Sequence, residues 1–151
     1  MSTYDFNRAC SAGNLEKAKR IWEINPNVEI STGYTNAWTW ACCNGHFDVA
    51  KWLYEIDPNI DLSVNNYTVF IWACGGGRLD MAQWMYSVDN TIDFSANNYE
   101  ALRWAAAEGH IETVKWLLSM DKNFDSDVIE ETLEEIDEER FPEMVELFKS
   151  L

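Results

Sequence analysis

The chain has 151 residues, 47% of them hydrophobic, and a formal net charge of -15. This length predicts one compact domain, residues 1–151. The negative charge argues against nucleic-acid binding, which depends mainly on lysine and arginine neutralising phosphates. No apolar run reaches the roughly 18 residues of a membrane span, and the N-terminal MSTYDFNRAC lacks the pattern of a secretion signal. We therefore expect an intracellular protein without membrane contact, whose four cysteines are reduced thiols.

Glycines recur along the chain at a constant spacing of 32 residues, at positions 13, 45, 77 and 109. An alanine stands four residues before each glycine. A large apolar residue stands two residues after each glycine, and an acidic residue follows it directly. A conserved-looking period of this length is typical of proteins built from stacked structural units. The period predicts that the chain is such a repeat protein.

Each unit is predicted to contain a short helix, a tight turn at the glycine and a longer helix. The i, i+3, i+4, i+7 spacing of an amphipathic helix marks the longer one, as in Val49, Trp52, Leu53 and Ile56. The glycine is expected to end the short helix in the left-handed conformation, and the acid after it to lie in the first turn of the long helix. In chain order the predicted units are approximately 3–34, 35–66, 67–98, 99–125 and 126–151.

The two ends of the predicted stack differ from its middle. Two helices of this length cannot bury their apolar faces alone, so units must stack, and end units need a polar outer face. Arg8 stands in the first unit where later units have Trp40, Trp72 and Trp104, and Arg20 stands where they have Trp52, Trp84 and Trp116. The last unit lacks the glycine, runs one residue short and is rich in glutamate. The predicted fold is an all-α solenoid of three internal units between an N-terminal and a C-terminal cap.

The segment AAAEGHIETVKWLL, residues 105–118, resembles the ankyrin repeat, in which two small residues precede Gly-His and a Val-Val-x-Leu-Leu-Leu helix. The family tetrapeptide Thr-Pro-Leu-His is eroded here to residues 68–71 and 100–103. The usual glycine after the long helix is replaced by Asn25, Asp57, Asp89 and Asp121, which tolerate a left-handed turn better than most residues. One residue is missing from the family's hairpin loop. The run NNYEALRWAAAEGHIETVKWLL is also similar to ankyrin arrays encoded by giant viruses of amoebae.

The residues most suggestive of chemistry are interpreted as structural. Cys10, Cys42 and Cys74 occupy equivalent positions about one helix diameter apart, too far to share a zinc ion. His46 and His110 lie two units apart and are expected to stabilise turns. The run Gly75-Gly76-Gly77-Arg78 lacks the strand and the Gly-Lys-Ser/Thr ending of a phosphate loop. Six of the eight tryptophans fall at two repeating positions and are expected to pack between units. We predict no metal, no cofactor, no catalytic residue and hence no enzymatic activity.

The resemblance implies a binding surface on the concave side, formed by hairpin tips and the exposed edge of the short helices. Exposed tyrosine and asparagine suit an interface. They also recur with the period, so that they could equally be building the turn. The candidate protein-binding residues are Thr35, Asn36, Cys43, Asn44, Asn65, Tyr67, Gly75, Gly76, Asn97, Tyr99, Ala107 and Glu108.

Two functions follow as hypotheses. The first is a monomeric protein–protein interaction module without chemistry of its own, whose acidic C-terminal end steers a basic partner. Residues 121–151 hold 12 acidic residues against Lys122, Arg140 and Lys149. The alternative is that this acidic end mimics a polyanion and blocks a basic, nucleic-acid-binding protein. Either activity is expected in the cytoplasm or nucleus, which for a viral protein means the host cell.

Overall fold

The computed structural model describes residues 2–31 and 36–151, and within these ranges the chain forms ten helices and no strand. Its contacts divide it into two compact units, Met1–Asp61 and Leu62–Leu151. The first unit contains α1 (Thr3–Ser11), α2 (Leu15–Ile24), α3 (Ala37–Cys43) and α4 (Phe47–Ile56). The second contains α5 (Val64–Gly75), α6 (Leu79–Val88), α7 (Ala96–Ala107), α8 (Ile111–Met120), α9 (Ser126–Glu135) and α10 (Pro142–Lys149).

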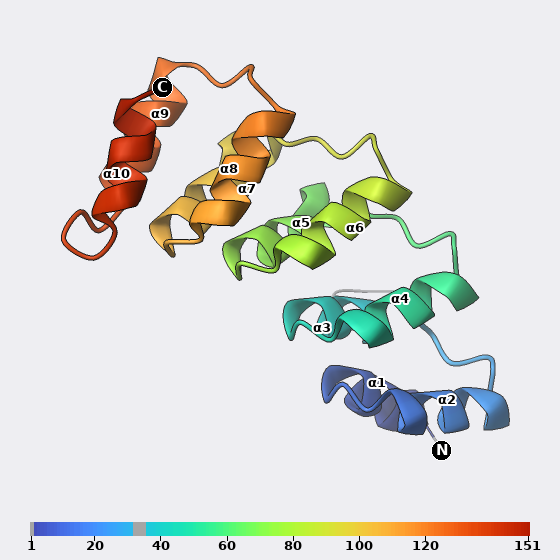
Figure 1. Ribbon diagram of the computed structural model, residues 1–151. Helices are drawn as coiled ribbons and strands as arrows, with labels where there is room; N and C mark the ends of the chain where they lie inside the picture. Colours follow the sequence, from blue (N-terminus) through green and yellow to red (C-terminus); the bar gives the residue numbers. More distant parts are fainter. Residues whose placement is uncertain (1, 32–35) are drawn as a thin grey trace. The chain divides into compact units, whose positions relative to one another are not determined.

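In the first unit, two helix pairs stack on one another. Helix α1 contacts both its partner α2 and the short helix α3, which in turn contacts α4 (Figure 1). The interface between the pairs contains the Trp52 ring, whose centroid lies 6.2 Å from that of buried Phe6 and 6.5 Å from that of Trp22. Burial of these large rings is the main favourable contribution to the stacking.

In the second unit, three helix pairs follow one another in the same way. The first helices of these pairs, α5, α7 and α9, occupy the positions of the predicted short helices, and we keep that name for them although, by their bounds, each is longer than the helix after it. They are in contact in sequence, and each is also in contact with the helix that follows it (Figure 1). Trp116 of α8 packs on three rings of the preceding pair and its loop, those of Phe70, Tyr86 and Phe94, with centroids 5.9–6.4 Å away. Trp52 and Trp116 therefore play equivalent roles: each packs between consecutive helix pairs of its own unit, as their shared repeat position predicts.

The turn between the helices of a pair is built on the periodic glycine. Gly13, Gly45, Gly77 and Gly109 all have φ between 70° and 79°, as predicted. The residue after each glycine donates its N–H to the carbonyl of the periodic alanine, for example Arg78 to Ala73 at 2.8 Å. This hydrogen bond satisfies a carbonyl that the end of the short helix would otherwise leave unpaired.

The predicted left-handed turn after each long helix is wrong. Asn25, Asp57, Asp89 and Asp121 have φ between -131° and -141°, which is extended backbone. Each side chain instead accepts a hydrogen bond from the backbone N–H two residues later, at 2.9 Å from Thr91 to Asp89 and from Asn123 to Asp121. The short polar side chain replaces glycine here by closing an Asx turn rather than by adopting a positive φ.

The left-handed residues lie elsewhere, in two Asn-Asn-Tyr triplets at the start of α5 and α7. Residues 65–67 and 97–99 all have φ between 52° and 63°. Three successive residues in this region are costly for side chains other than glycine, so surrounding contacts must hold them. The amide of Asn66 donates to the side-chain oxygen of Asn97, and Asn98 donates to Glu131 of α9 at 2.6 Å. These hydrogen bonds link consecutive repeats at the place where the family's hairpin was expected.

Stacked helix–turn–helix pairs thus make up each unit, and the prediction of an all-α, solenoid-type fold is confirmed. Of the buried side chains, the thiols of Cys10, Cys42 and Cys74 lie inside the pairs as expected, each no more than 1% exposed. The assignment of caps and repeat boundaries stays a prediction.

Candidate functional site: grooves between consecutive short helices

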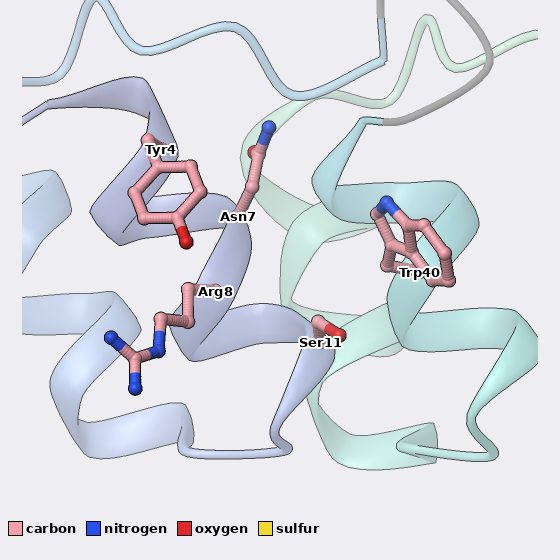
Figure 2. Close-up of a pocket in the computed structure, with 5 residues that line it drawn as sticks. All are labelled: Tyr4, Asn7, Arg8, Ser11 and Trp40. Carbon is pink, nitrogen blue, oxygen red and sulfur yellow. The ribbon is translucent and has the colours of Figure 1, made fainter.

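A groove lies between the short helices α1 and α3 of the first unit. Its volume is about 520 Å³. In Figure 2, Tyr4 and Arg8 rise from α1 on one side, Trp40 stands on α3 on the other, and Ser11 lies between them. Tyr4 is 71% exposed and Trp40 is 42% exposed, so both rings are accessible to a partner. Asn7 completes the lining.

A second groove lies in the other unit, at equivalent positions of the repeat. It has a volume of about 390 Å³, and all but one of its lining residues belong to α7. Glu100, Arg103, Trp104 and Ala107 are each 96 residues, three periods, after Tyr4, Asn7, Arg8 and Ser11. Glu135 of α9 takes the place of Trp40, because the last repeat is one residue short. Asn97 also contributes to the lining.

The tryptophan position of the short helix faces the preceding repeat. Trp104 lies against Gly75 of α5, where the indole occupies the space that a Cβ would need. Gly75 is buried for this reason. At the start of the chain Trp40 meets the Ser11 side of α1 instead, and Arg8 stands at the tryptophan position of that first repeat. The first groove therefore lies where Trp40 has Ser11, rather than a glycine, opposite it.

The electrostatics of the two grooves differ. Arg8 is the charged residue in the lining of the first. In the second, Arg103 forms an ion pair with Glu135 and lies 3.9 Å from a carboxylate oxygen of Glu131. The hydrogen bond to Glu135, together with the charges of both glutamates, raises the pKa of the Arg103 guanidinium above its usual value. Glu100 adds another carboxylate, so the second groove carries net negative charge whereas the first carries positive charge.

Several of the predicted binding residues do not lie on an open surface. Asn36 is 5% exposed and caps α3, accepting a hydrogen bond from the Thr39 N–H at 2.7 Å. Gly75 is covered by Trp104. Both are therefore excluded from the surface that we propose below. Thr35 lies outside the described residues. Such burial depends on what the neighbouring repeat places opposite each residue, which the repeat position alone does not reveal.

The other predicted residues of the short helices are accessible. Asn44 is exposed and donates to the Ser11 carbonyl and hydroxyl oxygens at 2.9 and 3.1 Å, and Cys43 beside it is half-buried. Gly76 and Glu108 are exposed, and Ala107 is half-buried in the lining of the second groove. In each unit, the surface that these residues form together with the groove of that unit is called the short-helix face. Within the first unit it comprises Tyr4, Arg8, Ser11, Trp40, Cys43 and Asn44; within the second, Gly76, Asn97, Glu100, Arg103, Trp104, Ala107 and Glu108.

The Asn-Tyr pairs take part in the turns. Asn65 and Asn97 are exposed, but both tyrosines are half-buried against the next loop of their own unit. The Tyr67 hydroxyl donates to the Thr91 carbonyl at 3.4 Å, and the Tyr99 ring meets Phe124 edge-on at 6.5 Å. Burial first, and then the charge and hydrogen bond of Asp121, raise the pKa of Tyr99. Of the two alternatives left open by the sequence, the contacts favour turn chemistry for the tyrosines.

We therefore expect Tyr99→Ala to destabilise the protein, by about 1–3 kcal/mol, because it removes a ring that fixes a left-handed turn against the next loop. Urea unfolding followed by circular dichroism measures the change. Tyr99→Phe keeps the ring contact with Phe124 and is expected to lose less than half as much. A melt of Tyr99→Ala that overlays the wild type would return this residue to the candidate interface.

The histidines contact the turn glycines of the preceding repeat. The ring of His46 covers Gly13, and its Nε2 lies 2.9 Å from the Ser11 carbonyl oxygen. The ring of His110 covers Gly77, and in the last repeat Phe141 covers Gly109 in the same manner. The interpretation of the histidines as turn-stabilising residues is confirmed. An aromatic side chain without ionisable nitrogens serves equally well at the last position.

The thiols differ in accessibility. Burial raises the pKa of Cys10 to about 12 and raises the pKa values of Cys42 and Cys74 as well. In the parts of the chain that the structure describes, no three His, Cys, Asp or Glu side chains are arranged to hold a metal ion, and no helix is long and apolar enough to cross a membrane. Only the thiolate reacts with alkylating reagents, so the three buried thiols should be inert in the folded protein.

Alkylation with iodoacetamide at pH 8 is expected to modify Cys43 in the native protein and all four cysteines after unfolding in guanidinium chloride. Mass spectrometry of tryptic peptides measures both. Cys43→Ser serves as the control, since it should leave the native protein unmodified on the same timescale. Fast native modification of Cys10, Cys42 or Cys74 would contradict the buried positions assigned to them.

The residues that reasoning from the sequence missed are Tyr4, Glu100 and Arg103. Arg8 and Trp40 had been interpreted as a capping residue and as packing between units, although Trp40 keeps 42% of its surface exposed. A usable signal was present in the sequence. The glycine beneath Trp104 has no counterpart beneath Trp40, where the equivalent residue is Ser11. A less well covered indole could have been inferred from that exchange.

Comparison with known proteins agrees with this architecture. The family model for ankyrin repeats, in three copies, matches residues 55–128. The crystal structure of the human ASB11 ankyrin repeat domain superimposes with a TM-score of 0.71 at 20% sequence identity, over 96% of this chain and 67% of that one. No curated protein sequence matches the chain. With its glycine turns and stacked helix pairs, the chain has the fold of an ankyrin repeat domain, and residues 55–128 match the ankyrin repeat family itself.

Proposed function

We propose that the protein is a non-catalytic interaction module that binds a protein partner through its short-helix face. Ankyrin repeats are in general protein–protein interaction modules. The observation that carries the proposal is the recurrence of a groove at the same repeat positions in both units, lined by Tyr4, Arg8 and Trp40 in one and by Arg103 and Trp104 in the other. Trp, Tyr and Arg are the residues that most often dominate the binding energy of protein interfaces.

The rest of the chain supports a non-catalytic function. Three of its four thiols are buried, its histidines cover glycines, and Trp52, Trp104 and Trp116 pack between repeats, so those side chains are already engaged in the fold. A nucleophile, a base and an orienting group would have to lie within hydrogen-bonding distance of one another to form an active site. We place the protein inside the cell as a monomer.

Filling both grooves with Ser11→Arg and Ala107→Arg should abolish recovery of the partner. Affinity purification from the native cell, followed by mass spectrometry, measures this. The matched control is Gln83→Arg, which adds the same side chain to an exposed position on the long helix α6. Circular dichroism melts must show that both proteins fold. Recovery of one and the same partner by the double variant and by the control would contradict binding at the short-helix face.

The alternative function, an acidic decoy for a nucleic-acid-binding protein, would rest on α9, α10 and the loop between them. Two of the glutamates in this region, Glu131 and Glu135, are engaged by Arg103, which reduces the negative charge offered there. Surface charges are screened at high salt, with a Debye length of about 3 Å at 1 M. Binding to a basic protein that disappears in high salt yet persists in the double groove variant would favour the decoy.

A further inference from the structure

We propose that the groove between α1 and α3 binds an acidic segment of the protein partner, with a carboxylate paired to Arg8 and an adjacent apolar side chain packed on Trp40 and Tyr4. The inference rests on the proposed function and adds to it the chemistry of what is bound. The ligand proposed for the first unit is therefore anionic, although the chain as a whole carries a net charge of -15.

Exposed aromatic rings stand on both walls of this groove. Tyr4 and Arg8 are one helical turn apart on α1, so that their side chains emerge from the same face of that helix. Tyr4 is the most exposed of the large hydrophobic residues in the described chain, at 71%, and Trp40 retains 42% of its surface at the opposite wall. Two exposed rings flanking an arginine bring together the three residue types that are most enriched among interface hot spots.

The charge around this groove complements an acidic ligand. The acid nearest to Arg8 in the same helix, Asp5, is turned toward the N-terminus, where its carboxylate accepts from both the backbone N–H and the hydroxyl of Ser2 at 3.0 Å. That arrangement lowers the pKa of Asp5, first through the backbone hydrogen bond. Up to residue 20, four basic residues, Arg8, Lys17, Lys19 and Arg20, outnumber two acids, Asp5 and Glu16. This part of the chain therefore carries positive charge within an otherwise acidic protein.

The two equivalent grooves differ in the charge that they present to an acidic ligand. An acidic segment placed in the α7–α9 groove would face Glu100 and Glu135, and the guanidinium of Arg103 is already paired with Glu135. Like charges at short range disfavour binding, whereas at Arg8 the same segment gains a charge-assisted hydrogen bond. The planar guanidinium can also engage a carboxylate through two parallel hydrogen bonds. An acidic ligand is thus directed to the first groove by attraction there and by repulsion at the second.

The test begins with a library of random 12-residue peptides displayed on phage, selected against the intact chain. We expect the enriched sequences to contain Asp or Glu next to an aromatic or branched aliphatic residue. One enriched peptide is then synthesised together with a copy in which every acid is replaced by lysine. Titration of ¹⁵N-labelled protein should shift the indole N–H signal of Trp40, which Trp40→Phe identifies, with the acidic peptide and not with the lysine copy.

Variants of the intact chain then test the groove itself. Arg8→Glu should weaken binding of the acidic peptide about 30-fold, as is common for a hot-spot arginine. Arg20→Glu is the matched control: it makes the same charge change in the same repeat, at an exposed residue outside the groove, and should weaken binding less than about threefold. Arg8→Lys should lose part of the affinity because it keeps the charge but not the planar fork.

The outcomes separate this inference from the proposed function. If Arg8→Glu and Arg20→Glu weakened binding of the acidic peptide equally, the effect would come from overall charge. That result would overturn a specific site at Arg8. Enrichment of basic or uncharged peptides, or binding that Ala107→Arg abolishes and Arg8→Glu leaves unchanged, would overturn the acidic ligand while leaving binding at the short-helix face intact. A selection without any enriched peptide would count against the inference as well. The proposed function is judged separately, by partner recovery with the double groove variant.

Discussion

Phe70→Ala is expected to destabilise the protein by about 3–5 kcal/mol, the range measured when a large ring is removed from a packed core. Phe70 is 1% exposed, and its ring centroid lies 5.7 Å from that of Phe94 and 6.3 Å from that of Trp116. The substitution therefore leaves a cavity between the α5–α6 and α7–α8 pairs and removes two edge-to-face ring contacts. Unfolding in urea, followed by far-ultraviolet circular dichroism, measures the change.

Phe124→Ala is the matched control for this cavity. It deletes the same side chain from a half-buried loop position, where the ring meets only Tyr99 among the aromatic contacts described. We expect it to destabilise the protein by about 1 kcal/mol, because a half-buried ring loses less contact and the loop can close around the gap. Comparable losses for the two variants would show that the rings between helix pairs are not what holds the repeats together.

The parts of the fold that could be predicted from the sequence are those that one repeat determines by itself. Gly77 must end the short helix because a positive φ is required there, whatever its neighbours are. Trp116 had to face another repeat, because a large apolar residue at a constant position of an amphipathic helix needs a partner surface. Both inferences need only local stereochemistry and the hydrophobic effect, and both agree with the structure.

The parts that could not be predicted depend on two repeats at once. Nothing in the run Asn97-Asn98-Tyr99 shows that all three residues are left-handed, because the hydrogen bonds that hold them come from Asn66 and Glu131 in other repeats. The family resemblance placed a hairpin there. Likewise Asp89 was expected to replace glycine in conformation, but its side chain closes an Asx turn with Thr91.

The candidate site could be predicted only in outline, for a similar reason. The short helices were correctly expected to be accessible at Asn44, Gly76 and Glu108. How closely a tryptophan packs on the preceding repeat depends on the size of the residue opposite it. Trp104 faces Gly75 and lies close against it, whereas Trp40 faces Ser11 and leaves an opening. Comparing each tryptophan with the residue that it faces in the preceding repeat, rather than with the equivalent tryptophans, would have predicted this opening.

Gly77→Ala is expected to destabilise the protein by about 2–3 kcal/mol. The glycine has a φ of 70°, a conformation that costs an L-residue roughly 1–2 kcal/mol. A Cβ there would also lie 2.5 Å from Nδ1 of His110, so that the ring which covers the turn would have to move. The measurement is again the free energy of unfolding in urea, and the variant should retain its helical signal in water.

Gly76→Ala, one residue earlier, should have the opposite sign. Gly76 has a φ of -86°, which alanine adopts readily, and it is exposed. The close neighbours of an added Cβ are the flexible end of Arg78 and, at 3.1 Å, the carbonyl oxygen of Trp72. Because alanine restricts the unfolded chain more than glycine does, we expect stabilisation by about 0.4–1 kcal/mol once Arg78 moves aside. If both alanine variants were destabilised equally, the left-handed turn at Gly77 would not be the feature that requires glycine in this protein.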